Sequence, residues 1–196
     1  MCRSRLAVLA VLLSGCSYAD PITFTHTGVG SGTIGTTTFT DAAFTITDVG
    51  DTTNVEDLSG AFSLDDSSAS IAIDGVGTFD FITGTRTFVA GGLVGFSRAT
   101  ASGNDLFNGP SNAAFSTWDL TSSIGPIDGT AQLLQWSLSP VDTSGGVLVF
   151  DDGITDTVFS ATLGTAVPEP TGTIAVGIGV LALAVVTRRR RKRSAD

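Results

Sequence analysis

Between residues 20 and 163 the chain is built of short runs in which every second residue is apolar, and turn residues separate the runs. The alternation is clear in residues 44–46, 71–73, 79–81 and 134–138, and no stretch of this region is amphipathic at the helical period. Because side chains alternate between the two faces of a strand, each run predicts a strand with one buried face. The region therefore predicts an all-β antiparallel fold, a β-sandwich of jelly-roll or immunoglobulin-like type.

The pattern also predicts where the strands lie and how one pair is joined. We expect strands at residues 22–27, 37–39, 43–47, 61–65, 69–73, 78–82, 85–90, 93–97, 113–120, 131–139, 147–150 and 157–163. A two-residue turn between residues 71–73 and 79–81 would place their apolar side chains on opposite faces. We therefore predict an odd-length loop within residues 74–78, where Gly75 and Gly77 supply the positive φ values.

Charge is distributed unevenly along the chain. From Asp20 to Pro170 there are 18 acidic residues and 2 basic ones, Arg86 and Arg98, a formal charge of −16. Phosphate contacts need a cationic surface, so this balance excludes nucleic-acid binding through the region.

The first 19 residues have the composition of a secretory signal peptide. Two arginines precede eight unbroken apolar residues at 6–13, and small residues follow. We expect cleavage after Ala19, while the alternative is a lipobox whose Cys16 would be acylated. In either case the exported domain at residues 20–166 keeps no pair of cysteines, so it has no disulfide.

The other end of the chain has the pattern of a membrane anchor. Residues 171–187 carry no charge, and 17 helical residues reach about 25 Å, slightly less than a hydrocarbon core of about 30 Å. The basic run that follows consists of Arg188, Arg189, Arg190, Arg191, Lys192 and Arg193. Such a cluster obeys the positive-inside rule, so we expect a transmembrane helix at 171–187 and a cytoplasmic tail at 188–196.

A short proline motif, Val167-Pro168-Glu169-Pro170, joins the domain to this anchor. Its prolines keep it extended, which suits a processing site. Pro-Glu-Pro, a short apolar helix and a terminal arginine cluster, in that order, resemble the PEP-CTERM sorting signal. The resemblance implies export by a Gram-negative bacterium, processing by a membrane exosortase, and association with exopolysaccharide or biofilm.

Two features of the domain resemble chemical sites. Gly30 to Gly35 matches the spacing GxGxxG, but no helix is expected after it, so we interpret it as a glycine-rich loop. His26 is the one histidine of the chain, in an alternating run, and is expected to be structural. No catalytic set is predicted, although two carboxylates with displaced pKa values in a cleft would favour a glycosidase.

Acidic turns offer oxygen ligands for Ca²⁺. Asp65-Asp66 is one such turn, and Asp151, Asp152 and Asp156 form another, but neither has the full ligand spacing of a known calcium loop. Solvated turn carboxylates are the alternative interpretation.

The two tryptophans bear on carbohydrate binding, because an exposed indole stacks on sugar rings. Trp136 alternates with Leu134 and Leu138 and is expected to be buried. Trp118 is out of phase with Phe115 in a regular strand, which predicts exposure and a possible carbohydrate contact.

These features favour a non-enzymatic envelope or matrix protein without a resident cofactor. Its precursor would be held at the inner membrane with the domain outside the cytoplasm, and the product would reach the cell surface or the extracellular space. Its expected partners are an exosortase-like enzyme and exopolysaccharide. The alternative is a surface carbohydrate-binding module or adhesin.

Overall fold

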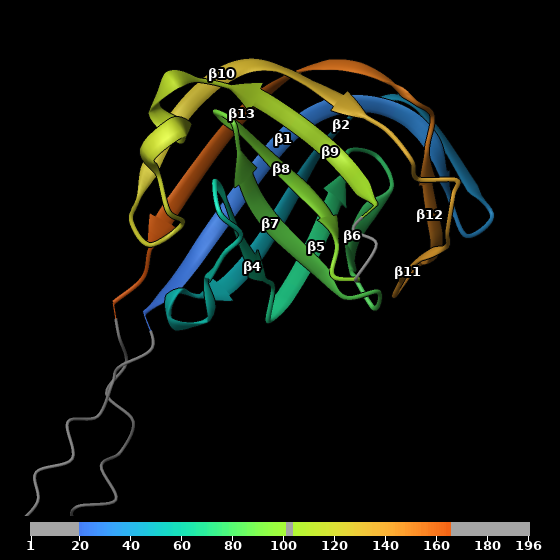
Figure 1. Ribbon diagram of the computed structural model, residues 1–196. Coiled ribbons are helices and arrows are strands. Elements are labelled where there is room, and N and C mark those ends of the chain that lie inside the picture. The colour runs from blue at the N-terminus through green and yellow to red at the C-terminus, as the bar shows by residue number, and fades with distance from the viewer. Residues whose placement is uncertain (1–19, 101–103, 166–196) are drawn as a thin grey trace, which may run out of the picture. The chain divides into compact units, whose positions relative to one another are not determined.

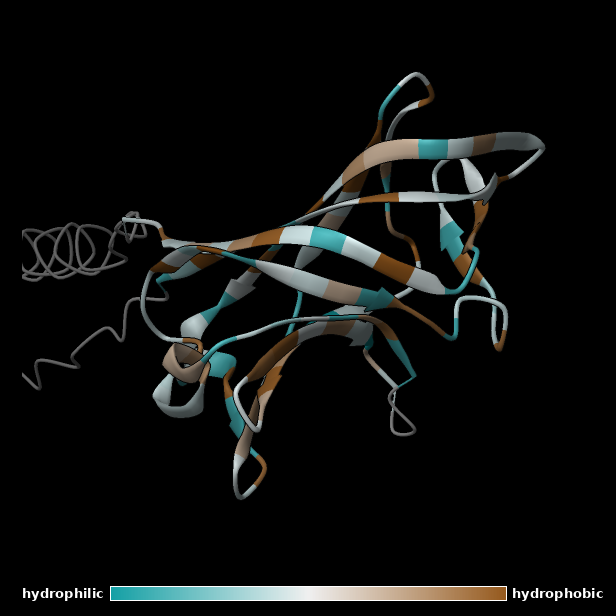
Figure 2. Cartoon of the chain, turned by 90° about the horizontal axis from the view of Figure 1, so that it is seen from above, coloured by the Kyte–Doolittle hydropathy of each residue, from teal (hydrophilic) through white to brown (hydrophobic). Residues whose placement is uncertain are grey.

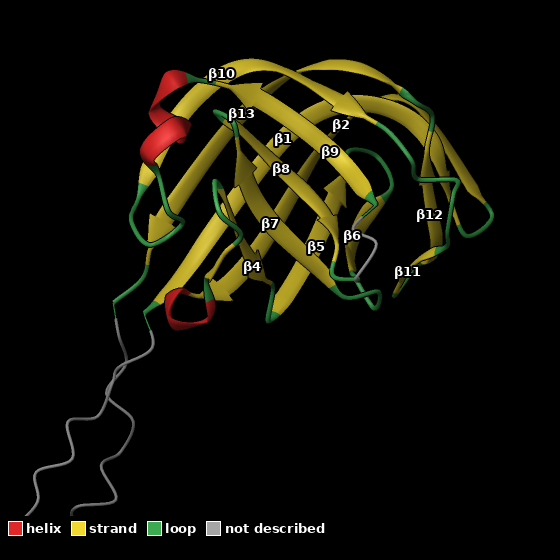
Figure 3. Cartoon of the chain, in the orientation of Figure 1, coloured by secondary structure: helices red, strands yellow, loops and turns green. Residues whose placement is uncertain are grey.

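The computed structural model describes residues 20–100 and 104–165 of the 196-residue chain. This part consists almost entirely of strands, with two short 3-10 helices, η1 (Thr52–Asn54) and η2 (Ala113–Thr117) (Figure 3). The strands are β1 (Pro21–Ile34), β2 (Thr37–Asp51), β3 (Glu56–Asp57), β4 (Ala61–Asp65), β5 (Ser68–Ile73), β6 (Gly77–Asp80), β7 (Thr85–Ala90), β8 (Leu93–Arg98), β9 (Asp105–Ser111), β10 (Ile124–Leu133), β11 (Val141–Thr143), β12 (Gly146–Phe150) and β13 (Gly153–Leu163).

The strands of the described part form one antiparallel sheet. Its order is β3-β4-β7-β8-β9-β10-β13-β1-β2-β5-β6, and β12 pairs with both β1 and β11. The sheet curls, so that β7, β8 and β9 lie over β1 and β2 (Figure 1). The predicted all-β antiparallel fold is confirmed. Because hydrogen bonds join all the strands into one sheet, the structure does not divide into two separate sheets, and the jelly-roll or immunoglobulin-like assignment stays a prediction.

The first strand, β1, organises the pairing. It pairs with β2 along its length, with β13 through residues 22–26, and with β12 through residues 32–34. The register of β1 and β2 shifts between Gly30 and Gly32, and such a bulge bends a strand. The bend allows a single strand to take part in two regions of the curled sheet.

The two ends of the domain lie side by side. Ile22 near the start of β1 pairs with Leu163 at the end of β13. The N–H of Gly164 then donates to the carbonyl of Pro21 at 2.6 Å. Figure 1 shows the blue start of β1 next to the orange end of β13. The segments before and after the domain therefore join it at one corner.

Two clusters of buried apolar side chains fill the inside of the sheet. The first core cluster contains Ile34, Phe39, Phe44, Ile46, Ala69, Ile71, Ile73, Phe96, Leu106, Phe107, Ala131, Leu133, Trp136, Val141, Leu148 and Phe150. The second core cluster contains Ile22, Phe24, Leu64, Val89, Val94, Phe115, Trp118, Leu120, Phe159 and Ala161. Hydropathy alternates along the strands, as expected where one face packs inward (Figure 2).

Most of the predicted strands are confirmed. Those expected at residues 61–65 and 85–90 coincide with β4 and β7, and most of the others overlap an observed strand. The odd-length loop is confirmed as well. Ile73 pairs with Gly77 and Ile71 with Phe79, which leaves three residues in the loop and places the apolar side chains on one face.

The strand predicted at residues 113–120 is wrong. The side-chain oxygen of Asn112 accepts a hydrogen bond from the N–H of Ala114 at 2.9 Å, and this cap begins helix η2. Residues three apart lie on the same face of a 3-10 helix. Phe115 and Trp118 therefore point in the same direction, into the second core cluster.

The strand predicted at residues 131–139 is only partly correct. β10 ends at Leu133, and the chain then turns at Gln135, whose φ is 59°. Trp136 is buried as predicted, and its indole N–H donates to the carbonyl of Leu106 at 2.8 Å. Leu138, by contrast, is 66% exposed. The alternation in this segment belongs to a loop, where it does not define two faces.

One long strand, β9, was not predicted. It contains Gly109-Pro110, a pair that normally argues against a strand because proline cannot donate to the ladder. Its register with β8 shifts twice. These irregular positions accommodate residues that a regular ladder would exclude.

Two glycines make a matched test of this register. We expect Gly32→Ala to lower the free energy of unfolding by about 2–3 kcal/mol, because a Cβ there would lie 2.1 Å from the carbonyl oxygen of Val149. Gly75→Ala should cost only about 1 kcal/mol, since its φ of 72° is strained for alanine but nothing lies within 4 Å. Urea denaturation measures both, and equal losses would contradict the pairing of β1 with β12.

Several predictions concern residues outside the described part. They are the signal peptide 1–19 with Ala19 or Cys16 as its processing residue, the motif at 167–170, the apolar segment 171–187 and the tail 188–196. These stay predictions. Within residues 20–100 and 104–165, no helix has the length and apolar character needed to cross a membrane.

Candidate functional site

Four polar side chains meet inside the curled sheet, and we call them the buried acid cluster: Asp48, Asp66, Thr85 and Thr87. Asp48 lies on β2 and points inward, in phase with Ile46. Thr85 and Thr87 are inward-facing residues of β7, and Asp66 follows the last residue of β4. The N–H of Asp66 donates to the carbonyl of Thr85 at 2.9 Å, which fixes Asp66 beside β7.

The carboxyl groups of this cluster are incompletely hydrogen-bonded. The hydroxyl of Thr87 donates to Asp48 Oδ2. Asp48 Oδ1 and both carboxylate oxygens of Asp66 are buried and have no hydrogen-bond partner among the described residues. Asp48 is 0% exposed. Buried polar atoms are nearly always paired in folded proteins, so three unpaired oxygens in one place are unusual.

Burial dominates the electrostatics of the cluster. It raises the pKa of Asp48 to about 7, and the hydrogen bond from Thr87 opposes the shift. Burial also raises the pKa of Asp66 well above its usual range, and repulsion by the Asp48 charge adds to the effect. Burial disfavours the charged form of both carboxyl groups, which explains why both shifts have the same direction.

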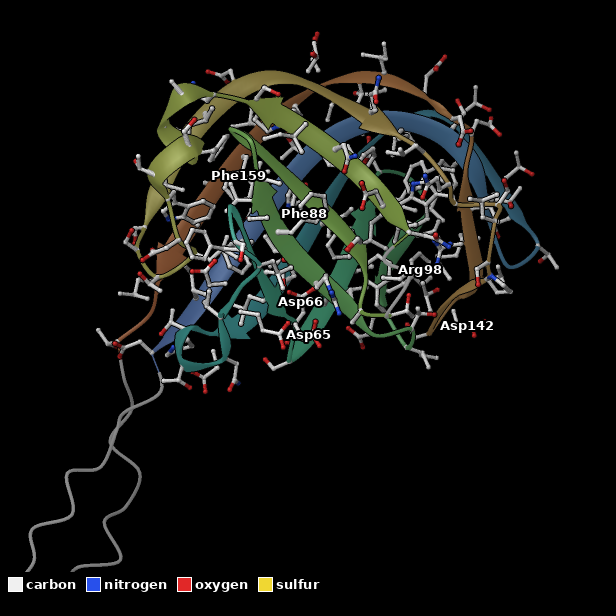
Figure 4. All side chains as sticks on the ribbon, in the orientation of Figure 1. Asp65, Asp66, Phe88, Arg98, Asp142 and Phe159 are labelled. Carbon is white, nitrogen blue, oxygen red and sulfur yellow. The ribbon has the colours of Figure 1, made fainter. Side chains whose placement is uncertain are left out.

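The two arginines of the domain are engaged elsewhere. Arg86 Nε lies 3.0 Å from the exposed carboxylate of Asp65. The buried guanidinium of Arg98 donates to the main-chain carbonyls of Gln135, Trp136 and Ser139. Figure 4 shows Arg98 well separated from Asp65 and Asp66. Arg98 therefore serves to hold the loop after β10.

His26 is structural, as the sequence predicts, and its surroundings are apolar. It is 0% exposed, and its ring centroid lies 4.8 Å from that of Phe159 and 5.6 Å from that of Phe107. These phenylalanines belong to different core clusters, so the imidazole connects the two. Neither ring nitrogen has a partner in the described part, and burial lowers the pKa of His26 to about 3. The ring is therefore neutral at physiological pH.

The predicted exposure of Trp118 is wrong. The residue is 5% exposed, and its ring packs against Phe24, Phe115 and Phe159. Its indole N–H donates to the carbonyl of Ser122 at 2.9 Å. Neither the face nor the edge of this indole is free for a sugar ring. The error arose because the local chain is helix η2 rather than a strand.

The predicted calcium residues do not come together. Asp151 and Asp152 are exposed in the turn between β12 and β13, and Asp156 is exposed on β13. Among residues 20–100 and 104–165, no group of three or more His, Cys, Asp or Glu side chains could hold a metal ion. Asp66, from the other candidate turn, instead lies beside Asp48.

Shallow depressions on the surface of the described part include two that carry or adjoin candidate residues of the sheet. One, of about 440 Å³, lies on β10, β13 and β1, and its carboxylates are Asp128 and Asp156. The other, of about 540 Å³, lies at the loop after β5. The buried acid cluster lines neither depression. Its carboxylate oxygens are buried, whereas glycoside hydrolysis uses an acid pair in an open groove.

The glycine motif has no phosphate-binding context. Residues 30–34 belong to β1, a turn follows at Gly35, and the next element is β2. A helix N-terminus, which would supply N–H groups to a phosphate, is missing at this place.

One signal in the sequence points to Asp48, although our sequence analysis did not use it. Phe44, Ile46 and Asp48 are alternate residues of one run, so the carboxylate continues the buried face. An acid in phase with a core strand is a candidate for a buried site. Its partner Asp66 cannot be found in this way, because only the tertiary pairing of β4 with β7 brings it near.

No known protein family, curated protein or solved structure matches the chain.

Proposed function

We propose that the protein is an exported component of the bacterial envelope or extracellular matrix, sorted through its C-terminal PEP-CTERM-like signal. The observation that carries the proposal is the order of the last 30 residues. A Pro-Glu-Pro motif at 168–170 is followed by an uncharged segment and then by six consecutive basic residues. This order suits a chain that stalls during translocation with its preceding domain outside.

The arrangement of the domain's ends supports processing on both sides. Pro21 and Gly164 are hydrogen-bonded neighbours, and neither lies inside a core cluster. Cleavage before residue 20 and near residues 167–170 would leave every described strand in place. A domain attached at one corner can also fold while it is still tethered to a membrane.

The composition of the domain suits a structural role outside the cell. Its charge is strongly acidic, which favours solubility in a hydrated matrix. We further propose that the curled sheet works as a sandwich-like unit of jelly-roll or immunoglobulin-like type, because residues of β2 and β7 face each other across its interior. A partner within the matrix would be exopolysaccharide, and the processing partner an exosortase-like enzyme.

Localisation tests the proposal. An epitope tag placed after Asp20 should appear in the envelope or medium of a Gram-negative host that carries the processing enzyme. Removing residues 188–193 should abolish retention of the precursor at the inner membrane. A matched variant with these six residues replaced by lysine should keep the precursor at the inner membrane, because retention depends on positive charge. A tag found only in the cytoplasm would contradict the proposal.

The carbohydrate-binding alternative has lost its main support. Its one candidate contact, Trp118, is packed in the second core cluster. We therefore do not propose a tryptophan-based sugar platform.

A further inference from the structure

The carboxyl groups of the buried acid cluster have no group of opposite charge beside them among the described residues. Asp48 Oδ1 and both carboxylate oxygens of Asp66 are buried without a donor in the part of the chain that the structure describes. Burying a charge without a partner is costly, and neighbouring carboxylates add repulsion. The hydroxyls of Thr85 and Thr87 carry no charge, so they do not neutralise the pair.

Cationic side chains of the described part do not fill this role. Between Asp20 and Pro170 the sequence contains two, Arg86 and Arg98. Arg86 alternates with Thr85 and Thr87 along β7, so it points to the opposite face, where it pairs with Asp65. Arg98 binds main-chain carbonyls on another part of the sheet. The neutralising group is therefore a proton or a bound ion.

The chemistry of the cluster favours an ion. Two carboxylates and two hydroxyls are all hard oxygen donors, which Ca²⁺ prefers and which it binds with a flexible coordination of 6–8 oxygens. A single proton shared by the pair would neutralise one carboxyl group and leave the charge of the other buried. A divalent cation would neutralise both carboxylates.

The geometry points to a binding site for a divalent cation of the Ca²⁺ type, with Asp48 and Asp66 as its charged ligands and the hydroxyls of Thr85 and Thr87 beside them. The ligands come from β2, from β7 and from the residue after β4. β2 lies in a different region of the curled sheet from β4 and β7, so a bound ion would link the two regions. The inference holds whether or not the protein is exported.

Asp66 is less deeply buried than Asp48. Its carboxylate oxygens are buried, but the residue as a whole is only partly buried and lies in the short connection between β4 and β5. The neighbouring Asp65 is exposed and pairs with Arg86. Figure 4 shows Asp65 and Asp66 next to each other at one end of the sheet.

Thermal unfolding of the full chain tests this site. At a pH of about 7.5, about 10 mM CaCl₂ should raise the Tm by roughly 3–10 °C if the affinity is that of extracellular calcium modules. NaCl at equal ionic strength should raise it much less, which separates binding from screening of the acidic surface. Asp48→Asn and Asp66→Asn should each remove the calcium effect.

Asp152→Asn is the matched control, because it removes the same charge from an exposed position and should keep the full calcium shift. Equilibrium dialysis with radioactive Ca²⁺ should find one bound ion in the wild type and none in the Asp66→Asn variant. This measurement tests the site even if Asp48→Asn does not fold.

A wild-type Tm that CaCl₂ raises no more than NaCl does would overturn the proposal. So would a calcium shift that survives in both variants. If CaCl₂ does not raise the Tm of the wild type and the Asp48→Asn variant is more stable than the wild type, the two carboxyl groups share a proton instead.

Discussion

Phe159→Ala is expected to lower the free energy of unfolding by about 3–5 kcal/mol, the largest loss from any single truncation proposed for this chain. Phe159 is 0% exposed and lies on β13. Its ring contacts Phe24, His26, Phe115 and Trp118, with centroid separations from 4.8 to 6.4 Å. The substitution would open a cavity where the second core cluster meets His26, and urea denaturation measures its cost.

Val158→Ala is the control for this experiment. Val158 is the neighbouring residue on β13, points to the other face and is 37% exposed. Its truncation should cost less than about 1 kcal/mol, because surface substitutions rarely cost more. Similar losses from the two variants would show that β13 does not present Phe159 to the core.

Acidification is expected to destabilise the protein through His26. Burial lowers the pKa of His26 to about 3 in the folded chain, against an ordinary value of 6.5. Between these values the unfolded chain binds the extra proton, so stability falls as the pH drops below 6.5 and is fully present above it. Lowering the pH from 7 to about 4.5 should therefore lower the free energy of unfolding by about 2–3 kcal/mol through His26.

The His26→Leu variant isolates this contribution. Leucine does not titrate. Lowering the pH from 7 to about 4.5 should therefore change the difference in unfolding free energy between wild type and variant by about 2–3 kcal/mol, in favour of the variant. The comparison is needed because Asp48 acts in the opposite direction. Its raised pKa makes the calcium-free protein lose stability as the pH rises through about 7. A pH-independent difference would mean that His26 is accessible to water.

Much of the fold could be predicted because periodicity is a local property. The strands at residues 61–65 and 85–90 and the loop after Ile73 follow from alternation and from the requirement that apolar side chains share a face. The curl could not be predicted, since it depends on which strands pair at long range. In particular, nothing local indicates that β4 pairs with β7 rather than with β5.

The errors at the candidate site have local causes. Exposure of Trp118 would follow from a regular strand, but the cap formed by Asn112 begins a 3-10 helix, and the indole points into the core. The calcium ligands predicted from the sequence are acidic residues that lie close together along the chain. The structure instead unites Asp48 with Asp66, which are 18 residues apart and lie on different parts of the sheet. Tertiary pairing decides such a site.

The intact mass of the protein isolated from the cell envelope and from the medium tests the central claim most directly. The account predicts a chain that begins at Asp20 and has lost the basic residues 188–193. A chain with its full leader and its full basic tail, isolated from the cytoplasm, would contradict it.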